Sequence, residues 1–565
     1  MNDSVLFLVL RRMRAPLIVM ILVYAISVFG LVLIPGVDAE GKATAPMSFF
    51  DAFYFISYTA STIGFGEIPN AFSYAQRFWV TLCIYLTVIG WSYAIVSILN
   101  LLKDEGLQRA LATNRFTRKV RRMSEPFCII CGAGETGSII CSTLDQVQMR
   151  FVVIDDRAAP LQELELGDYH ADVPALLAEA QHPHTLQLAG LQLPNCKAVL
   201  AVTNSDEVNL AIAMNVRLLN PGIPIIARAE KATTGANMNS FGTNFIVDPY
   251  ALYARRLALA LRNPPGFQLI EWLTRVPDTP LPDLPAPPTG HWIVCGYGHF
   301  GRTIVHELDA LGMHDQVTII DPRPTTPDDH QSVLSTGTAS SPLIDAGIAN
   351  AVGLVAGSDN DINNLSIAIT ARELNPKIFI VMRQNSAGNS ILFDRFDADL
   401  TMVTTRTIAH ACLSYLTTPM LGRFTRAIEQ HPPEWAASII ESLEPLCKGK
   451  VPFVWRLQIN RVKTPALSHA LLTGTPLTLN TLLTSNRERS RALPIMPLMV
   501  ERAGHLTLLP EKDFALASGD RILFVGSRDA WNEQKVTAQN INALEYVISG
   551  RVITGSLLGK LLRQA

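Results

Sequence analysis

Long apolar runs occur only in the first hundred residues of the 565-residue chain. One uncharged run extends from Ala15 to Gly36 and a second from Phe78 to Leu102. Each is at least as long as the roughly 20 residues that a membrane-spanning helix needs. We therefore predict two spanning helices, at about residues 15–35 and 78–102. A signal peptide is the alternative for the first run, but the run is long, lacks a clear cleavage site and is followed by a second span.

Basic residues flank the two predicted spans on one side of the membrane. The loop between the spans has Asp38, Glu40 and only Lys42 before the next apolar segment. By the positive-inside rule, both ends of the chain are expected in the cytoplasm and the protein in the plasma membrane, in contact with lipid. The flanking basic residues are Arg11, Arg12 and Arg14 before the first span, and Arg109, Arg115, Arg118, Lys119, Arg121 and Arg122 after the second. Within the second span, Trp79 and Trp91 could anchor the helix or pack against its neighbour.

An aromatic segment, MSFFDAFYFISYTAST, begins at Met47 and predicts a helix over about residues 48–61, too short to span. It leads into TIGFG, residues 62–66. Irregular backbone at membrane depth is tolerated only where it lines a cavity or is buried in protein. Gly64 and Gly66 can adopt backbone conformations closed to other residues, which allows successive carbonyl groups to point toward one axis. Four copies around that axis would replace the hydration shell of a cation.

This segment resembles the potassium-channel selectivity filter, T-V-G-Y-G followed by an acid. The resemblance implies that Thr62, Ile63, Gly64, Phe65 and Gly66 conduct K⁺, in a tetramer. Phe65 lacks the tyrosine hydroxyl that can brace the filter against the pore helix, which leaves the degree of selectivity open. In the family a glycine near the middle of the inner helix can act as a gating hinge. Gly90 is the candidate; the alternative is a small residue that permits close helix packing.

After residue 126, buried strands alternate with helices, and the pattern occurs twice. FCIICGAGETGSIICSTL followed by FVVIDD, and HWIVCGYGHFGRTIVHEL followed by VTIIDP, each predict a strand, a G-x-G-x-x-G turn, a helix and a strand that ends in an acid. This is the dinucleotide fingerprint: phosphates lie on the glycine turn and the acid accepts from ribose hydroxyls, which favours NAD over NADP. The alternative is an empty Rossmann scaffold. The candidate nucleotide-binding residues are Gly132, Gly134, Glu135, Thr136, Gly137, Asp155 and Asp156 in the first copy, and Gly296, Gly298, His299, Gly301 and Asp321 in the second.

The repeat continues without a gap at an offset of 155, because NSDEVNLAIAMNVRLLNPGIPIIARA matches DNDINNLSIAITARELNPKIFIVMRQ. Internal duplication is the simplest explanation. Both copies resemble RCK domains, also called TrkA-N domains, which regulate potassium conductance. The expected fold is a membrane α-helical pore domain joined to two tandem Rossmann-like α/β RCK domains and a small α+β C-terminal subdomain. The predicted boundaries are 1–102 for the pore domain, 103–125 for a gating linker, 126–250 for the first RCK lobe, 251–290 for a helical crossover and proline-rich linker, 291–404 for the second lobe, and 405–565 for crossover helices and the C-terminal subdomain.

Together the resemblances imply a ligand-gated potassium channel and not an enzyme. Four subunits would bring eight RCK domains into a gating ring, regulated by NAD, ADP or ATP, with Ca²⁺ as a further possible ligand. The alternatives are a membrane-tethered NAD-dependent oxidoreductase and the regulatory subunit of a potassium transporter. The first would need a substrate domain with a base, and the second normally lacks a pore. A formal net charge of −2 gives no reason to expect nucleic acid as a partner.

Eight cysteines in a mostly cytoplasmic chain predict free thiols. Cys128 and Cys131 fall on a predicted strand, and we interpret them as buried residues, not as a redox or metal pair. Solvated loops are favoured over metal sites at His182 and His184, and at the cluster of Asp328, Asp329 and His330. No metal site is therefore predicted.

Overall fold

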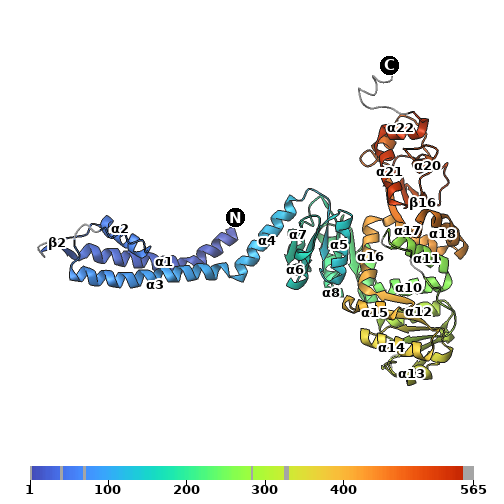
Figure 1. Ribbon diagram of the computed structural model, residues 1–565, viewed down its shortest axis with the longest axis horizontal. Coiled ribbons are helices and arrows are strands. Elements are labelled where there is room, and N and C mark those ends of the chain that lie inside the picture. The colour runs from blue at the N-terminus through green and yellow to red at the C-terminus, as the bar shows by residue number, and fades with distance from the viewer. Residues whose placement is uncertain are drawn as a thin grey trace, which may run out of the picture. The chain divides into compact units, whose positions relative to one another are not determined.

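The computed structural model describes residues 3–38, 42–67, 71–275, 277–281, 284–323 and 330–551 (Figure 1). The chain divides into two compact units, Met1–Arg122 and Met123–Ala565, and each is described by itself.

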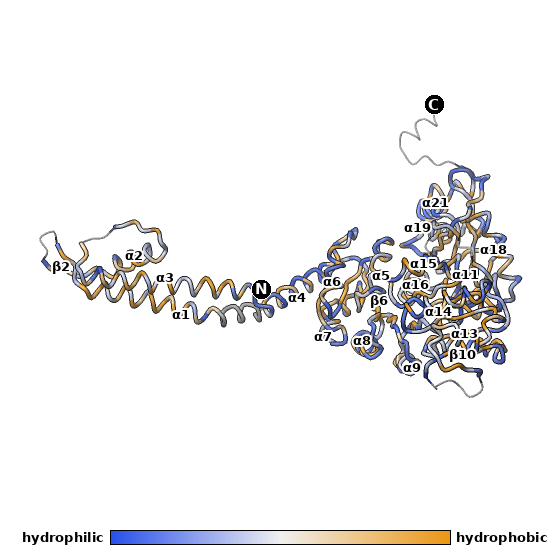
Figure 2. The backbone as a smooth tube through the Cα atoms, turned by 60° about the horizontal axis from the view of Figure 1, so that its bottom comes forward, coloured by the Kyte–Doolittle hydropathy of each residue, from blue (hydrophilic) through white to orange (hydrophobic). Residues whose placement is uncertain are grey.

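Two long apolar helices, α1 (Asp3–Leu33) and α3 (Tyr74–Leu102), pack along each other in the N-terminal unit. Their candidate membrane spans are Met13–Leu33 and Tyr74–Leu101, of which only 22% and 17% is buried. A core helix of a soluble protein would be mostly buried, whereas these helices expose large apolar side chains from Leu17 to Leu33 and from Tyr74 to Leu99. Figure 2 shows that both helices are coloured mostly as hydrophobic. Both helices begin earlier than predicted, because an uncharged run marks only the apolar part of a helix. The second begins at a capping box formed by Ser73 and Gln76.

A short hairpin and a short helix connect the two long helices. Strands β1 (Pro35–Val37) and β2 (Ala43–Pro46) pair antiparallel. Helix α2 (Phe49–Ala60) follows, and its N-cap Ser48 accepts a hydrogen bond from the amide of Asp51. After α3 the chain turns at residues 103–104 into α4 (Glu105–Arg122), which is basic in its last turn. The order of span, short helix, extended segment and span is therefore the order that the sequence predicted.

Trp79 packs between the two long helices, which settles one question that the sequence left open. Its indole ring lies against Gly30 of α1, and its Nε1 donates a hydrogen bond to the carbonyl oxygen of Ser27 at 3.1 Å. A Cβ atom added at Gly30 would lie 2.1 Å from Cε2 of Trp79. Trp91, in contrast, is 40% exposed. Gly30 is thus a close-packing glycine of this helix pair.

Replacing Gly30 with alanine should destabilise the helix pair by about 1–3 kcal/mol, because the Trp79 ring has to move. The thermal midpoint of the detergent-solubilised protein measures the effect. Gly90→Ala is the matched control, since a Cβ there would lie no closer than 3.5 Å to another heavy atom. Alanine improves helix propensity at both positions by up to about 1 kcal/mol, which cancels in the comparison. Equal midpoints for the two variants would contradict the packing assigned to Gly30.

The second unit contains two parallel six-stranded sheets with the same strand topology. Their orders are β5-β4-β3-β6-β7-β8 and β11-β10-β9-β12-β13-β14, each the doubly wound order of a dinucleotide-binding fold. The first lobe comprises β3 (Phe127–Cys131), α5 (Glu135–Gln146), β4 (Arg150–Asp155), α6 (Ala158–Leu166), β5 (Ala175–Leu177), α7 (Pro183–Leu188), β6 (Cys196–Ala201), α8 (Asp206–Leu219), β7 (Ile225–Arg228), α9 (Ala232–Ser240) and β8 (Phe245–Val247). The second comprises β9 (Trp292–Cys295), α12 (His299–Ala310), η1 (His314–Gln316), β10 (Val317–Ile320), β11 (Gln331–Val333), α13 (Ser340–Asp345), η2 (Ile348–Asn350), β12 (Gly353–Ala356), α14 (Asp361–Leu374), β13 (Phe379–Gln384), η3 (Ala387–Asn389), α15 (Ser390–Phe396) and β14 (Leu400–Val403).

The two lobes exchange helices. Helix α10 (Pro249–Arg262) follows the first sheet but packs on α12, where its Tyr250 and Leu257 share a core with Trp292 and Phe300. Helix α16 (Thr404–Thr417) follows the second sheet but packs on α5, so that Cys412 lies in the core of the first lobe. Figure 1 shows α10 beside α12 and α16 beside α5. Each lobe therefore packs against the helix that follows the last strand of the other lobe.

A C-terminal subdomain completes the unit and confirms the predicted fold class. Its four-stranded antiparallel sheet has the order β15-β18-β16-β17. Its elements and the helices that connect it to the lobes are α11 (Pro264–Thr274), α17 (Pro419–Gln430), α18 (Pro433–Cys447), β15 (Phe453–Gln458), α19 (Pro465–Leu472), α20 (Leu479–Leu483), β16 (Ile495–Arg502), β17 (His505–Leu508), β18 (Arg521–Gly526), α21 (Arg528–Gln539) and α22 (Ile541–Ser549).

All eight cysteines are free and buried, as the sequence predicted. Cys128 and Cys131 lie on β3, a strand that is buried throughout. Burial raises the pKa of the Cys128 thiol to about 12, and it raises that of Cys131 as well. Because the thiolate is the form that attacks disulfides and binds metals, these two residues act as small apolar core residues.

Candidate pore and nucleotide-binding sites

The segment after α2 turns sharply and then extends with positive φ at alternate residues. The amides of Ile63 and Gly64 donate to the carbonyl oxygen of Tyr58, at 3.0 and 3.2 Å. The φ angles are +62° at Thr62, +67° at Gly64 and +75° at Gly66. Only glycine adopts such angles at little cost, so the two glycines are required by the backbone path. Gly64 and Gly66 thus adopt the kind of backbone conformation that the sequence argument expected of them.

Two tyrosines of α2 contact Glu67 at the C-terminal end of this segment, and sequence reasoning missed both. The hydroxyl of Tyr58 donates to the carbonyl oxygen of Glu67 at 2.8 Å, and that of Tyr54 to its carboxylate at 3.1 Å. The ring of Phe65 lies edge-on to Tyr58, with centroids 6.0 Å apart. Two tyrosine hydroxyls of α2 thus hold the end of this segment, a contact that Phe65, which has no hydroxyl, cannot make. The clue in the sequence was the pair of tyrosines four residues apart, which share one helix face.

Replacing Tyr58 with phenylalanine should lower selectivity for K⁺ over Na⁺ about fivefold. The variant keeps the ring contact but removes a hydrogen bond of about 1 kcal/mol that holds the Glu67 carbonyl. The reversal potential under a K⁺/Na⁺ gradient measures the ratio. Tyr85→Phe is the control, because that ring is 67% exposed on α3. An unchanged reversal potential in Tyr58→Phe would remove the bracing role.

Gly90 lies on α3 opposite α1. An added Cβ would lie 3.5 Å from Sδ of Met20 and 3.6 Å from Cγ2 of Val23, which are ordinary contact distances. Close packing therefore does not require a glycine at this position. The gating-hinge role of Gly90 stays a prediction.

The two glycine turns have nearly identical geometry. Gly132 and Gly296 have φ angles of +107° and +95°. A Cβ at Gly137 or Gly301 would lie 2.0 or 1.9 Å from the carbonyl oxygen of the first glycine, so the helix can approach the strand only without a side chain there. Gly134 and Gly298 are the N-caps of α5 and α12 and have no side-chain cap. The first amides of both helices are thus available to an anion.

The acids at the strand ends are engaged by their own turns. Asp155 is 4% exposed; it accepts from the amide of Ala133 at 2.6 Å and from the amide and Nε of Arg157. Asp321 is 2% exposed and accepts in the same way from the amide of Tyr297 and from Arg323. Burial would raise the pKa of Asp321, but the hydrogen bonds from Arg323 and Tyr297 outweigh it and lower that pKa. Access of a ribose to these carboxylates requires the arginine side chains to move.

Arg157 and Arg323 are candidate site residues that sequence reasoning missed. Nη2 of each guanidinium lies beside the middle glycine, 3.4 Å from a Cβ built at Gly134 and 3.9 Å from one built at Gly298. Both side chains are 57% exposed. The signal was the D-x-R pattern that the two copies share after the second strand.

Other predicted residues are placed differently. Thr136 is 4% exposed inside the first turn of α5, whereas the side chain of Asp156 is 67% exposed and lies 3.9 Å from Nε of Arg157. His182 and His184 are exposed, and His182 pairs with Glu179. Asp328 and Asp329 lie outside the described residues.

The repeated polar residues hold strand ends together in each copy. Buried Asn209 accepts from the amide and hydroxyl of Thr203 and donates to the carbonyl oxygens of Thr203 and Arg228. Asn364 makes the same four bonds with Ser358 and Arg383. All polar atoms of these two amides are engaged, so we interpret Asn209 and Asn364 as structural residues.

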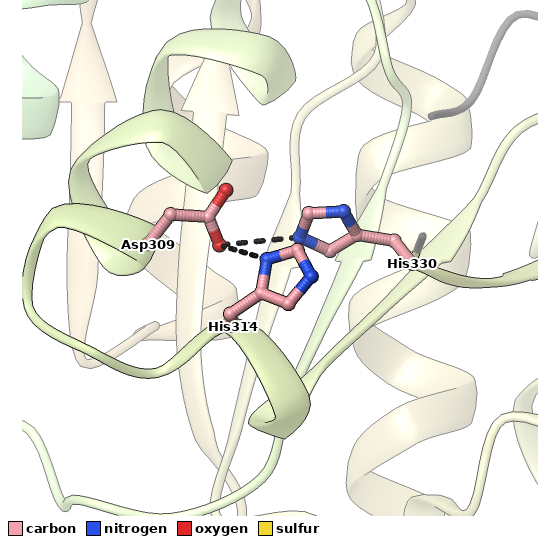
Figure 3. A group of neighbouring side chains, drawn as sticks. All are labelled: Asp309, His314 and His330. Atoms are coloured by element: carbon pink, nitrogen blue, oxygen red, sulfur yellow. Dashed lines mark hydrogen bonds and ion pairs between the residues drawn. The ribbon is translucent and has the colours of Figure 1, made fainter. Parts of the chain in front are cut away.

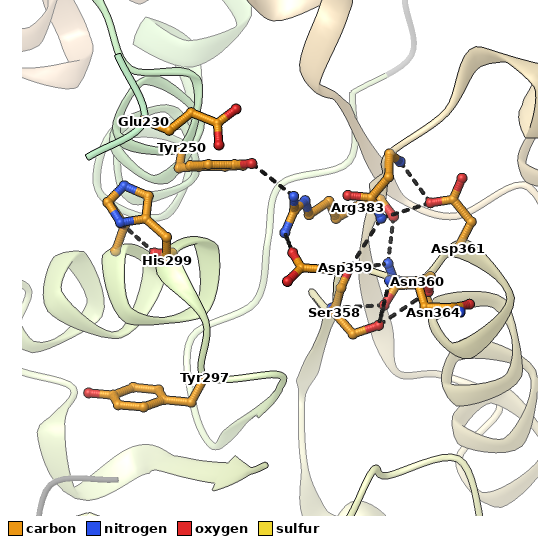
Figure 4. A network of polar contacts seen from close by, with 12 residues as sticks. Glu230, Tyr250, Tyr297, His299, Ser358, Asp359, Asn360, Asp361, Asn364 and Arg383 are labelled. Carbon is orange, nitrogen blue, oxygen red and sulfur yellow. Dashed lines mark hydrogen bonds and ion pairs between the residues drawn. The ribbon is translucent and has the colours of Figure 1, made fainter. Parts of the chain in front are cut away.

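Each glycine turn also contacts the other lobe. Glu135 accepts from the amide of Ala387 at 3.3 Å, and Nε2 of His299 lies 3.5 Å from Asp248, the N-cap of α10. Next to His299, the Tyr250 hydroxyl accepts from Arg383 at 2.8 Å, and that guanidinium also pairs with Asp359 (Figure 4). A ligand on either turn would therefore meet side chains that both lobes position.

Comparisons with known proteins agree with this architecture. The ion channel family model matches residues 17–103, and the TrkA-N domain model matches residues 128–249 and 292–404. The chain combines an ion-channel domain with two TrkA-N domains. Potassium channel protein 1 of Methanocaldococcus jannaschii is 26% identical over 226 residues, which cover 40% of this chain and 66% of that protein. Probable potassium channel protein 2 of the same organism is 24% identical, over 43% of this chain and 65% of its own length.

The matched region thus spans about two thirds of the length of these two relatives. Among solved structures, one titled GsuK Channel is similar over 97% of this chain and 100% of its own, with 17% identity and a TM-score of 0.46. The TrkA-N domains correspond to the two Rossmann-like lobes, and the ion-channel domain to the two apolar helices with the segment between them.

Proposed function

We propose that four copies of this chain form a potassium-selective channel that nucleotides gate through the TrkA-N domains, with the domain limits given above. The observation that supports it best is the T-I-G-F-G segment: it has alternating positive φ, follows a 12-residue helix and lies between two exposed apolar helices. Carbonyl groups of residues 62–66 would replace the hydration shell of K⁺. Both chain ends and the ring of eight TrkA-N domains would lie in the cytoplasm.

The nucleotide site in this proposal is the glycine turn with its arginine. Phosphates would accept from the first amides of α5 or α12 and from the guanidinium of Arg157 or Arg323. The carboxylate of Asp155 or Asp321 would orient that arginine, and it would accept from the ribose once the arginine side chain has moved aside. NAD and ADP both contain the diphosphate and ribose that such a site recognises.

Gating would follow from the contacts between the lobes. Because Glu135 contacts Ala387 and His299 contacts Asp248, a nucleotide on either turn would favour one angle between the lobes. The linker of residues 103–125 would transmit that change to the inner helix α3. Such gating requires that the nucleotide bind the open and closed rings with different affinities.

Ion flux into liposomes that contain the purified protein tests this function. We expect flux of K⁺ but not of Na⁺, and a change in that flux with NAD or ADP on the cytoplasmic face. Adding Ca²⁺ in the same assay tests the remaining predicted ligand. An oxidoreductase or a regulatory subunit of a transporter would give no selective K⁺ flux. Absence of that flux would therefore refute the proposal.

The affinity of the second turn for NAD should fall as the pH rises. A hydrogen bond with Asp248 raises the pKa of His299, against the effect of burial; Glu230 adds to the rise and Arg302 opposes it. The protonated imidazole attracts phosphate, and that attraction is lost as the pH rises through the raised pKa, above the ordinary value of about 6.5. We expect about a tenfold loss in affinity, the value of one charge-assisted contact.

Calorimetric titration with NAD between pH 6 and 8 measures this dependence. It uses Arg157→Gln protein, in which the first turn is weakened. NAD is the probe because its diphosphate does not titrate in this range. His299→Gln should flatten the profile. A flat profile in the protein with His299 intact would contradict the prediction.

A further inference from the structure

Three side chains from separate elements of the second TrkA-N domain converge on one point (Figure 3). Asp309 lies near the end of α12, His314 begins η1, and His330 immediately precedes β11. Nδ1 of His314 and Nε2 of His330 lie 3.2 and 3.1 Å from the same oxygen, Oδ1 of Asp309. One nitrogen or oxygen atom from each residue lies within 4.8 Å of the other two. Among the described residues, this is the one group of three or more such ligands.

The surroundings of this group differ from the solvated loop that the sequence favoured for His330. The side chain of His330 is only 3% exposed, while those of Asp309 and His314 are 32% and 38% exposed. The site therefore has a buried wall and an open side. That expectation for His330 is wrong, because its neighbour in space is Asp309, which is distant in sequence.

We propose that Asp309, His314 and His330 bind a divalent transition-metal ion of the Zn²⁺ class. Two imidazoles and a carboxylate are ligands that zinc prefers, whereas Ca²⁺ and Mg²⁺ take oxygen ligands. Two ligands at about 2.0–2.1 Å from a tetrahedral zinc ion are about 3.3 Å apart. The two separations from the carboxylate oxygen, 3.1 and 3.2 Å, are close to that value, and the two imidazole nitrogens lie within 4.8 Å of each other. An ion could therefore replace the two hydrogen bonds to Asp309 if the two rings adjust. The fourth position would face the open side.

The first TrkA-N domain provides an internal comparison. Gly132 and Gly296, and Asp145 and Asp309, are each 164 positions apart, whereas Asp155 and Asp321 are 166 apart. The sheet register makes Phe151 and Val317 equivalent, so the two additional residues of the second copy lie in the turn that contains His314. Asp145 pairs with one histidine, His170, at 2.7 Å. In the second copy, the longer turn brings a second histidine, His314, to the corresponding aspartate.

The proposed site is separate from the glycine turn. His299 and Asp309 are ten residues apart on α12, a rise of about 15 Å. A bound ion would link the end of α12 to η1 and to the edge strand β11. It should therefore stabilise the second TrkA-N domain, and this does not depend on whether the pore conducts.

Metal titration of the full-length, chelator-treated protein in detergent tests the proposal. We expect one Zn²⁺ per chain by calorimetry, one Co²⁺ with visible d–d absorption, and a higher thermal midpoint with Zn²⁺. His314→Ala and His330→Ala should each weaken binding at least about ten- to hundredfold, since changes in residues that only support a ligand already cost that much. His170→Ala, in the matching pair of the first domain, should leave binding unchanged.

Absence of stoichiometric binding would overturn the proposal, as would full binding in His314→Ala or loss of binding in His170→Ala. If His330→Ala does not fold, His314→Ala decides, because its side chain lies at the open side of the site. Equal affinity for Ca²⁺ would also count against it, since nitrogen ligands disfavour that ion.

Discussion

Replacing Gly66 with alanine is expected to abolish potassium current through the reconstituted protein. Gly66 has a φ of +75°, and an L-residue in the left-handed region costs roughly 1–2 kcal/mol. In a tetramer that cost would arise four times around one axis, and relief of the strain would rotate the carbonyl groups that are proposed to bind K⁺. Because conduction needs every ion site in the row, we expect loss of current, not a partial decrease. Planar-bilayer recording measures it.

Gly422→Ala is the matched control for this variant. Gly422 lies within α17, has no positive φ, and has no heavy atom within 4 Å of an added Cβ. Its current should equal that of the unmodified protein. The two variants should elute alike in gel filtration, which separates a blocked pore from a failed assembly. Normal potassium current in a correctly assembled Gly66→Ala protein would mean that residues 62–66 are not the filter.

The second large effect is expected at Arg157, where glutamine should weaken nucleotide binding to the first TrkA-N domain about ten- to hundredfold. The guanidinium is held by buried Asp155 beside the middle glycine and is itself 57% exposed. A charge-assisted hydrogen bond to phosphate is worth about 1.5–3 kcal/mol. Glutamine keeps the backbone bond that Asp155 accepts from residue 157, so the turn itself should persist. Calorimetric titration with ADP or NAD measures the affinity.

Arg150→Gln controls for the loss of a positive charge elsewhere in the same lobe. Arg150 lies at the start of β4, at the opposite end from Asp155. The guanidinium of Arg150 donates a hydrogen bond to the carbonyl oxygen of Asp172. Nucleotide affinity should not change in this variant. Arg323→Gln should produce the same loss in the second domain, which assigns each binding event to one copy. If neither Arg157→Gln nor Arg323→Gln alters binding, the Rossmann-like lobes are scaffolds and the nucleotide half of the proposal fails.

Much of the architecture could be predicted from local sequence. Uncharged runs mark spanning helices because the bilayer sets their length, and the glycine pattern marks a turn because only glycine fits there. The ends of the helices were harder to predict. Helix α1 begins at Asp3 and includes a charged stretch before the apolar run, which composition alone would not assign to a membrane span.

The sequence could not show which surfaces of the folded chain pack against each other. The apolar face of α10 predicts burial but not that its partner is α12 of the other lobe. The dinucleotide fingerprint points to Asp155 but not to its engagement by Arg157, which comparison of the two copies would have suggested. His330 was grouped with its sequence neighbours, although the residues that it contacts come from α12 and η1. The filter roles of residues 62–66 and the nucleotide roles of both turns stay predictions.

The most direct test of the central claim is one bilayer recording of the purified protein under a K⁺/Na⁺ gradient, with NAD or ADP added to one chamber at a time. We predict a current that reverses near the K⁺ equilibrium potential and that changes in open probability only when nucleotide reaches the side of the TrkA-N domains. A current that reverses near zero, or one that ignores nucleotide on both sides, would contradict the account of a nucleotide-gated potassium channel.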